Sequence, residues 1–331
     1  MTEYRVSVLV TFYNQEKYVD RALGSIISQK TDFGIKIIIG DDGSTDNTQY
    51  IIKEWIKKYP DTIELHVMKR TPGKHIAGFR ASRNRLNLLK YVNTDYFLFL
   101  DGDDFYISKC KLQKQVDILD KRKNRDCIAC GHNSLMIYSD GISTPIMSKK
   151  IKNGKYTPKE YWNKLYFHTD SLMIRSNIIQ YIDFKLLENN FNDNMITFLL
   201  IQKGKIYYLI SEMVAYMQTG DGVWTAGKAV INNIRNMFLY DLCNIINPKM
   251  KKETMLRFSG TWKELLKIRK SIDLKELKRL KKEAYDKKLY NSIRWISYNN
   301  LGPLERQKLC LKAVFIWCWS IYRRIVLKIF H

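Results

Sequence analysis

The sequence contains little that would place the chain across a membrane or in an oxidising compartment. Its nearest approach to a membrane span is residues 313–322, ten residues that include one serine, whereas a bilayer requires about 20 apolar residues. The opening MTEYRVSVLV lacks the basic segment, apolar core and cleavage site of a secretory signal. Six cysteines scattered over 331 residues do not indicate a disulfide framework. We therefore expect a cytosolic chain without a transmembrane helix.

Two binding signatures are incomplete or missing. Cys127 and Cys130, with His132 nearby, have the spacing of half a zinc site, but no second pair follows and the run is apolar. Small buried thiols are the favoured interpretation. Neither G-x-x-x-x-G-K-[ST] nor G-x-G-x-x-G occurs, which excludes the usual glycine-rich phosphate loops. If the protein binds phosphates, we expect a metal ion to assist.

Acidic residues are few relative to basic ones. The chain has 56 Lys and Arg against 33 Asp and Glu, a formal charge of +23. Residues 249–331 hold 22 of the basic and 7 of the acidic residues, and so carry +15. This concentration of charge indicates an acidic partner, either nucleic acid or anionic lipid.

Apolar residues alternate between strand-like and helix-like spacing over the first hundred positions. Strand-like runs at 5–12, 35–40, 62–68 and 96–100 are separated by helical patterns at 16–29, 48–59 and 81–91. This predicts the α/β class, with a mostly parallel sheet covered by helices on both faces. Further strands are expected at 126–138 and 205–217, and helices at 157–166 and 194–203. From about residue 227 the pattern is helical, with one amphipathic run at 262–284, so we expect two domains, 1–226 and 227–331.

Polar loops follow three of the expected strands: TFYN at 11–14, DDGSTD at 41–46 and DGDD at 101–104. Because ligands gather at the carboxyl ends of parallel strands, these loops are expected to converge on one rim. Gly102 permits a tight turn that places Asp101 and Asp103 on one side of the third loop. Two carboxylates presented in this way suit a hard divalent cation that keeps positions open for a substrate diphosphate.

Four stretches resemble the family 2 glycosyltransferases of GT-A fold. In order they are SVLVTFYNQEKYVDRALGSIISQ from residue 7, IIIGDDGSTDNTQYI from residue 37, RASRNRLN from residue 80 and YFLFLDGDD from residue 96. The resemblance is specific over residues 5–105 and extends to about 230. It implies a Rossmann-like catalytic domain and a nonprocessive, inverting enzyme. Such an enzyme moves a sugar from a nucleotide diphosphate, usually UDP, to an acceptor hydroxyl.

The same resemblance implies roles for the loop residues. The implied nucleotide-binding residues are Thr11, Phe12, Tyr13, Asp41, Asp42, Arg83 and Asp101. The first three would line the nucleoside pocket, and Asp41 or Asp42 would hydrogen-bond the base together with Arg83. Asp101 would face the ribose, Asp103 and Asp101 would bind Mn²⁺ or Mg²⁺ at the diphosphate, and Asp104 would orient these ligands. Arg83 and Arg85 also admit an interpretation as solvated helix charges.

An inverting transfer needs a general base that takes the proton of the acceptor hydroxyl. The family places this base in an acidic pair ahead of a helix, and the matching stretch here is FNDNM at 191–195. Asp193 is the expected base, with Asn192 in place of the usual Glu and with helix capping as the competing role; Glu188 is the next candidate. The tentative acceptor or sugar contacts are Asp104, His168, Arg175, Tyr216, Asp221, Gly222 and Trp224.

The last segment, residues 304–331, has basic ends around the aromatic centre AVFIWCW. This composition is typical of a helix at a membrane interface, and a final helix docked on the domain is the alternative. We expect a peripheral protein of the inner membrane face that acts on a glycan or lipid-linked acceptor in surface polysaccharide or glycolipid synthesis. A nucleic-acid-binding protein explains only the charge, so no nucleic acid partner is expected. Metal-dependent phosphoester hydrolysis stays open as the third interpretation.

Overall fold

A computed structural model describes residues 3–70, 77–148, 150–218, 229–268 and 274–298 of the chain. The chain separates into two compact units, residues 1–226 and 227–331. The boundary lies between a long strand and the first of a series of helices. The two units are described in turn.

The first part of unit 1 alternates strands and helices as expected from the apolar spacing. Its elements are β1 (Tyr4–Phe12), α1 (Val19–Ile27), β2 (Gly34–Asp41), α2 (Thr48–Lys58), β3 (Ile63–Val67), α3 (Ala77–Leu88) and β4 (Tyr96–Asp101). The strands begin and end within two residues of the predicted runs, because β-branched residues and flanking polar loops mark both ends. The α3 helix begins four residues before its predicted start, where the sequence has few apolar residues.

The second part of unit 1 contains two long strands among short elements. Its elements are β5 (Phe105–Tyr106), α4 (Lys111–Asp120), β6 (Cys127–Tyr138), β7 (Ser143–Pro145), β8 (Gly154–Tyr156), α5 (Pro158–Lys164), β9 (Met173–Arg175), α6 (Phe184–Leu187), α7 (Asp193–Ile201) and β10 (Lys205–Gln218). Short 3-10 turns join several of them, among them η3 (Thr169–Ser171), which leads directly into β9.

One sheet runs through unit 1 in the order β3-β2-β1-β4-β9-β6-β10-β5. The strands β3, β2, β1 and β4 are parallel to one another, and so are β6 and β10. Between these two sets, β9 is antiparallel to both of its neighbours. The sheet is therefore mixed, and its long pairings are parallel, as the sequence predicted; the sequence did not predict β9. The antiparallel strand has only three residues, which is too short to leave a periodic signal.

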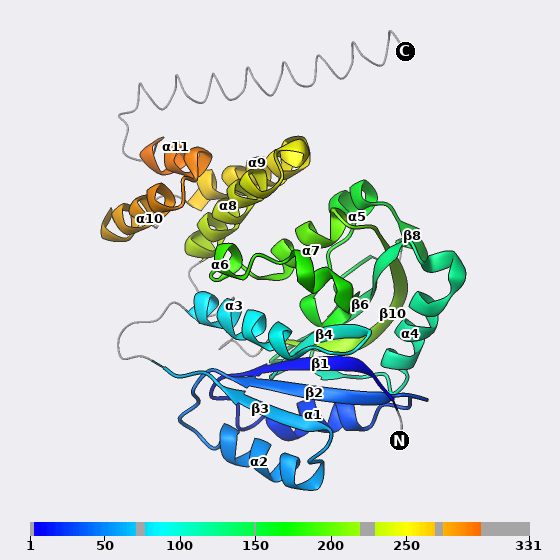
Figure 1. Ribbon diagram of the computed structural model, residues 1–331. Helices are drawn as coiled ribbons and strands as arrows, with labels where there is room; N and C mark the ends of the chain where they lie inside the picture. Colours follow the sequence, from blue (N-terminus) through cyan, green and yellow to red (C-terminus); the bar gives the residue numbers. More distant parts are fainter. Residues whose placement is uncertain (1–2, 71–76, 149, 219–228, 269–273, 299–331) are drawn as a thin grey trace. The chain divides into compact units, whose positions relative to one another are not determined.

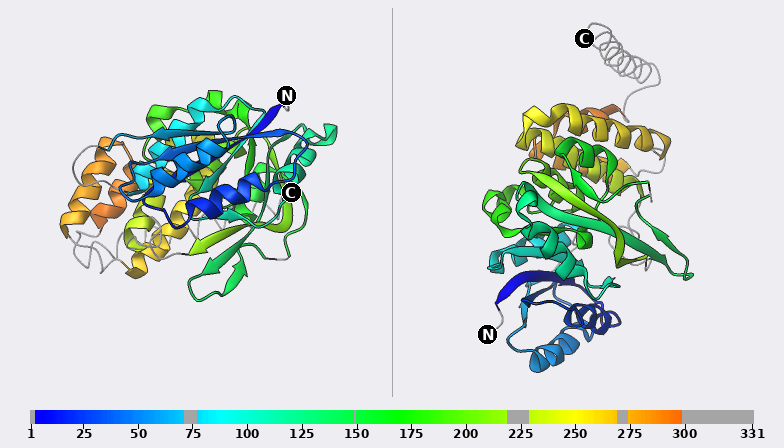
Figure 2. Two further views of the ribbon diagram at one scale, coloured as in Figure 1. Left: turned by 90° about the horizontal axis from the view of Figure 1, so that it is seen from below. Right: turned by 90° about the vertical axis from the view of Figure 1, so that its right-hand side faces the viewer.

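The β1 strand lies inside the sheet and its two faces contact different helices. Val6, Val8 and Val10 belong to the apolar core shared with α1 and α2, and all three are fully buried. The other face packs under α3, which contacts both β1 and β2. Figure 1 shows α1 and α2 below the strands and α3 above them, and the view from below in Figure 2 shows the first two helices lying across the sheet. Helices on both faces explain why β1 reads as a continuous apolar run.

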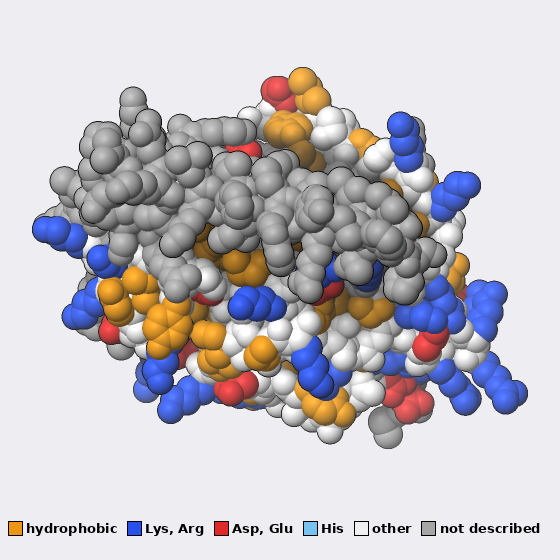
Figure 3. Space-filling view, turned by 90° about the horizontal axis from the view of Figure 1, so that it is seen from above, with side chains coloured by type: hydrophobic (Ala, Val, Ile, Leu, Met, Phe, Trp, Pro, Cys, Tyr) orange, Lys and Arg blue, Asp and Glu red, His pale blue; other side chains and the backbone are white. Residues whose placement is uncertain are grey.

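Unit 2 is helical, and its described elements are α8 (Ala229–Ile246), α9 (Lys251–Ile268), α10 (Leu274–Asp286) and α11 (Tyr290–Tyr298). The predicted amphipathic run at 262–284 is divided between α9 and α10. Asp241 on α8 accepts hydrogen bonds from the amide of Asn291 and the backbone N–H of Ser292, which ties α8 to α11. Figure 3 shows basic side chains spread among apolar and uncharged ones.

Among the helices that the structure describes, none is long and apolar enough to cross a membrane. The segment 304–331, which the sequence assigns to a membrane interface, lies outside the described residues. Cys127 and Cys130 are buried free thiols in β6, as the sequence indicated.

The close approach of α3 to the sheet depends on Gly40 in β2. A Cβ atom at this position would overlap the Oδ1 atom of Asn84, whose Nδ2 donates to the Gly40 carbonyl at 2.8 Å. We expect Gly40→Ala to lower the free energy of unfolding by about 1–3 kcal/mol, as overpacked cores do. Gly24→Ala on α1 is the control: its Cβ would meet only Trp55, at 3.8 Å, and the better helix former should add up to about 1 kcal/mol. Urea unfolding followed by circular dichroism measures both. Equal stability of the two variants would show that α3 does not depend on this contact.

Candidate active site

The loops after β1 and β4 meet because their last residues are partners in the sheet. Thr11 lies opposite Asp101, and the Thr11 hydroxyl donates to Asp101 Oδ1 at 3.2 Å. The next residue, Gly102, donates its N–H to the Thr11 carbonyl at 2.9 Å. A Cβ on Gly102 would overlap the Phe12 ring. Residue 102 must therefore be glycine, because no side chain fits between its backbone and the Phe12 ring. Phe12 is 1% exposed and lies beneath this loop.

The loops after β1 and β2 are also joined, so all three polar loops converge as predicted. Asn14, in the left-handed region at φ 50°, accepts from the Thr45 N–H at 2.8 Å through its side-chain oxygen, and its own backbone N–H donates to the Ser44 hydroxyl oxygen at 2.9 Å. Asp41, expected at the nucleobase, accepts the N–H groups of Gly43 and Ser44 at 3.0 and 2.8 Å and the amide of Gln49 at 2.7 Å. Its carboxylate is fully buried and holds the loop.

Asp42 is buried together with an arginine from α3. Arg80 Nε donates to Asp42 Oδ2 at 2.7 Å, and Arg80 Nη2 pairs with the second carboxylate oxygen. The side chains of Arg80 and Asp42 are 6% and 8% exposed. Arg83, which the sequence assigned to this place, points elsewhere: its Nε contacts Asn189 Oδ1 at 3.1 Å and Glu188 Oε1 at 3.0 Å. The α3 residue that pairs with Asp42 is thus Arg80. Arg83, expected at the nucleobase beside Asp41 or Asp42, contacts neither carboxylate among the interactions of the described residues.

A second arginine of α3 compensates the charge of Asp101. Arg85 Nη2 lies 2.6 Å from each carboxylate oxygen of Asp101. Burial would raise the pKa of Asp101, but the charges of Arg85 and His168 together with the hydrogen bonds from Arg85 and Thr11 outweigh it and lower that pKa. Burial would likewise lower the pKa of Arg85, but the charges of Asp101, Asp193 and Asp170 outweigh it and raise that pKa. Arg85 therefore lies among three carboxylates and keeps its charge.

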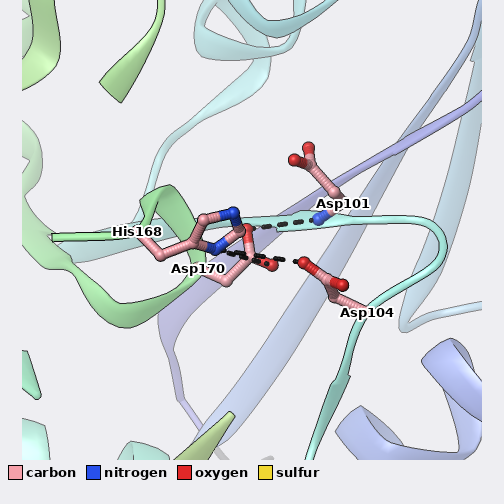
Figure 4. Close-up of side chains that lie close together, drawn as sticks. All are labelled: Asp101, Asp104, His168 and Asp170. Carbon is pink, nitrogen blue, oxygen red and sulfur yellow. Dashed lines mark hydrogen bonds and ion pairs between the residues drawn. The ribbon is translucent and has the colours of Figure 1, made fainter. Parts of the chain in front are cut away.

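Asp101 also belongs to a compact group of potential metal ligands. Asp101, Asp104, His168 and Asp170 each offer one ligand atom, and these atoms all lie within 4.8 Å of one another. Figure 4 shows His168 and Asp170 reaching from the η3 region toward the loop after β4. His168 Nδ1 is 3.6 Å from Asp170 Oδ2 and 3.9 Å from Asp104 Oδ2. Asp103 is not in this group; its carbonyl accepts from Arg21 Nη2 at 3.1 Å.

Crowded carboxylates perturb one another in this group. Burial, with the added charge of Asp170, raises the pKa of Asp104 well above its usual value. Burial also raises the pKa of Asp170 to about 6, although His168 opposes the shift. Burial and the charge of Asp101 raise the pKa of Asp103 to about 6. So much negative charge in one buried place calls for a counter-ion or a proton.

The helix α7 presents Asp193 to the same region. Its N-cap is Asn192, whose side chain accepts from the Met195 N–H at 3.2 Å, so capping does not occupy Asp193. The carboxylate of Asp193 instead accepts from the hydroxyl of Tyr166 at 3.1 Å and from that of Thr169. Since Thr169 belongs to η3, the same turn supports Asp193 and supplies a member of the ligand group.

The remaining predicted residues fall into three groups. Tyr13 is 40% exposed, and the Arg70 guanidinium lies 3.8 Å from its ring centre. Tyr216 is at the site, with its ring centre 4.0 Å from that of His168. Arg175 does not lie at the site. It is opposite Tyr96, at the start of β4, and donates to the carbonyl oxygens of Cys127 and Leu119. Asp221, Gly222 and Trp224 lie outside the described residues.

Sequence reasoning missed Asp170 and undervalued Arg85. Asp170 follows His168 in FHTDSLMIRS, and its site role depends on β9 returning antiparallel beside β4. A signal was present in the polar residues HTD directly before a short apolar run, but it does not show which strand lies alongside. Arg85 is two residues from Arg83, which places the two side chains on different sides of the helix.

Comparisons with known proteins agree on one family. The profile described as Glycosyl transferase family 2 matches residues 7–182, just over half of the chain. An uncharacterised protein of Mycobacterium tuberculosis is 31% identical over 175 residues, 53% of this chain and 44% of that protein. The minor teichoic acid biosynthesis protein GgaB of Bacillus subtilis is 27% identical over 283 residues, 80% of this chain and 30% of that protein. The chain thus spans less than half the length of these relatives.

Solved structures agree with this fold. The S. aureus TarS 1-349 structure in complex with UDP-GlcNAc has a TM-score of 0.64 and 17% identity, covering 87% of this chain and 81% of that one. The mannosyltransferase PcManGT from Pyrobaculum calidifontis, in complex with GDP-Man and Mn2+, has a TM-score of 0.52 and 14% identity, covering 90% and 87%. These likenesses show a GT-A-like fold followed by helices.

The buried pair of Arg80 and Asp42 makes a testable contribution to stability. Arg80→Met should lower the free energy of unfolding by about 3–5 kcal/mol, because it leaves the Asp42 carboxylate buried without its cation. The double variant Arg80→Met, Asp42→Asn should recover much of that loss. Lys57→Met, which breaks an exposed pair with Glu54, is the control and should leave the stability nearly unchanged, because solvent screens this pair. Urea unfolding of the four proteins tests this, and a double variant no more stable than Arg80→Met would contradict a coupled pair.

Proposed function

The chain belongs to the glycosyl transferase family 2 and is a glycosyltransferase, and we propose that it transfers one sugar from a UDP-sugar to an acceptor hydroxyl with inversion at the anomeric carbon. The proposal rests chiefly on one observation: Arg85 lies among Asp101, Asp170 and Asp193. The carboxylates expected to serve the donor and the carboxylate expected to activate the acceptor therefore share one buried guanidinium. Residues 1–226 are proposed as the catalytic domain.

The donor side of the proposed site is the rim formed by the three loops. The exposed ring of Tyr13 offers a face for the nucleobase. Asp101 is proposed to accept a hydrogen bond from the ribose. The carboxylates of Asp101, Asp103 and Asp104 are the groups that this loop offers to Mn²⁺ or Mg²⁺. The residues fit such a cation, since the buried Oδ2 atom of Asp104 has no hydrogen-bond partner. When bound, the cation neutralises charge on the leaving diphosphate.

Asp193 is proposed as the general base. It would take the proton of the acceptor hydroxyl while that oxygen forms a bond to the anomeric carbon and the bond from that carbon to the diphosphate breaks. Its carboxylate is oriented by two hydroxyl donors, Thr169 and Tyr166, and its charge helps to raise the pKa of Arg85. A carboxylate held in one direction is what a positioned base requires.

The proposed acceptor is a hydroxyl of a cell-surface polymer or its lipid-linked precursor. The name of GgaB, minor teichoic acid biosynthesis protein, supports a polymer of this class. The complex of TarS with UDP-GlcNAc supports a UDP-linked donor. The +15 charge of residues 249–331 supports action close to an anionic surface, with residues 304–331 proposed to contact the inner membrane face.

Replacing the proposed base separates chemistry from binding. Asp193→Asn should lower kcat by about 10²-fold or more, because the amide cannot take the acceptor proton, while the affinity for UDP with Mn²⁺ stays within about twofold. Asp183→Asn is the matched control, since Asp183 caps α6 and asparagine caps equally well. Steady-state kinetics and calorimetry measure the two quantities. Normal turnover in Asp193→Asn, with loss in Glu188→Gln, would move the base to Glu188.

The donor class is tested by ligand-dependent stability of the full chain. A nucleotide sugar that binds the folded state raises the unfolding free energy by about 2.7 kcal/mol at a hundred times its Kd, so the melting temperature should rise with UDP-sugars in the presence of Mn²⁺. If no nucleotide sugar shifts it and DNA does so in a salt-dependent way, the nucleic-acid alternative is correct. Release of sugar 1-phosphate and UMP, with no product formed on an added acceptor, would instead indicate hydrolysis at phosphorus.

A further inference from the structure

We propose that His168 and Asp170 complete a divalent-cation site with Asp101 and Asp104, so that the cation is held both by the loop after β4 and by the η3 turn. Neither His168 nor Asp170 belongs to the DGDD motif. The part that this cation plays in sugar transfer rests on the proposed function. The binding of the cation does not rest on the proposed function, so it can be tested with Mn²⁺ alone.

The spacing of the four ligand atoms suits a single cation. Hard divalent cations bind oxygen at roughly 2.0 to 2.6 Å, so two ligands on opposite sides of one are about 4 to 5 Å apart. The four atoms all lie within 4.8 Å of one another. They come from two segments far apart in the sequence, Asp101 and Asp104 on one side and His168 and Asp170 on the other.

The backbone directs a free oxygen of each buried carboxylate toward the same point. Asp104 Oδ1 accepts from the Met217 N–H at 2.8 Å, and Asp170 Oδ1 accepts from the Asp101 N–H at 3.3 Å. The other oxygen of each, Oδ2, has no hydrogen-bond partner, and neither has His168 Nδ1. Asp104, Asp170 and His168 are only 1%, 0% and 5% exposed. Three unpartnered buried atoms aimed at one place are costly unless something fills it.

When all three carboxylates of the group are ionised, two of their negative charges are not compensated by Arg85. Three ionised carboxylates face one arginine, Arg85, which pairs with Asp101. Lys111 lies close enough to Asp170 to feel its charge, but its ammonium group donates to Gln115 at 3.0 Å, and burial lowers its pKa to about 7. Lys111 thus makes no ion pair with Asp170 among the interactions described, and a divalent cation would balance the remaining charge of the group.

The imidazole of His168 distinguishes this site from an all-oxygen one. Its ring packs on Tyr216, with centroids 4.0 Å apart and planes 31° apart, which holds Nδ1 toward Asp104 and Asp170. Nitrogen ligands favour transition metals, whereas Mg²⁺ prefers oxygen alone. We therefore expect Mn²⁺ to bind more tightly than Mg²⁺.

A proton shared between Asp104 and Asp170 is the competing occupant. It would satisfy both Oδ2 atoms, and burial favours it by raising the pKa of each carboxyl. It would leave His168 without a role, and it would predict that amide replacement of Asp170 relieves repulsion at no cost to metal affinity. The experiment below separates the two occupants.

The test uses the full chain, without an affinity tag, and Mn²⁺ alone. Electron spin-echo spectroscopy of the bound Mn²⁺ should show modulation from a coordinated imidazole nitrogen, lost in His168→Gln and kept in the control His66→Gln. By calorimetry, Asp170→Asn should bind Mn²⁺ at least about tenfold more weakly than the wild type. Asp126→Asn, at an exposed carboxylate paired with two lysines, is the matched control and should bind within about twofold.

Absence of the nitrogen modulation in the wild type would overturn the proposal, and this measurement requires no variant to fold. Wild-type Mn²⁺ affinity in Asp170→Asn, together with higher metal-free stability, would assign the site to a shared proton. Mn²⁺ binding as expected in a protein that transfers no sugar would leave the site intact and contradict only the proposed function.

Discussion

Negative charge buried at the carboxyl ends of β2 and β4 is the constraint on which the site depends. Asp41 is compensated by backbone N–H groups, whereas Asp42 and Asp101 require Arg80 and Arg85. Both arginines come from α3, so the position of one helix sets the charge balance at the ends of two strands. The glycine in β2 that lets α3 approach is therefore as important for the electrostatics of the rim as for its packing.

The parts of the fold that could be predicted are those with a local signal. The strands and helices of the first hundred residues follow from apolar spacing, and the convergence of the polar loops follows from a general property of parallel strands. The antiparallel β9 strand could not be predicted, because three residues carry no period. Asp170 was missed for the same reason, since only that strand brings it beside Asp101.

Gly102 shows how a correct residue can be assigned for an incomplete reason. The sequence suggested that it allows a turn with Asp101 and Asp103 on one side. In the structure, glycine is needed because a side chain at residue 102 would overlap the Phe12 ring. The carboxylate that lies with Asp101 in the group of potential metal ligands is that of Asp104, not that of Asp103. The ring of Phe12, expected in the nucleoside pocket, lies beneath the loop instead. Motif positions thus identified the right segment, while packing decided which side chain faces which way.

Asn192 caps α7 and leaves the carboxylate of Asp193 free of that role, which has a consequence for the entropy of the reaction. Because the asparagine caps α7, the backbone of the next residue is ordered by the helix itself, and two hydroxyl donors restrict its carboxylate further. The conformational freedom of this side chain is lost once, when the protein folds, and not again in each catalytic cycle. A single polar substitution ahead of a helix can therefore preorganise a neighbouring group without contacting any substrate.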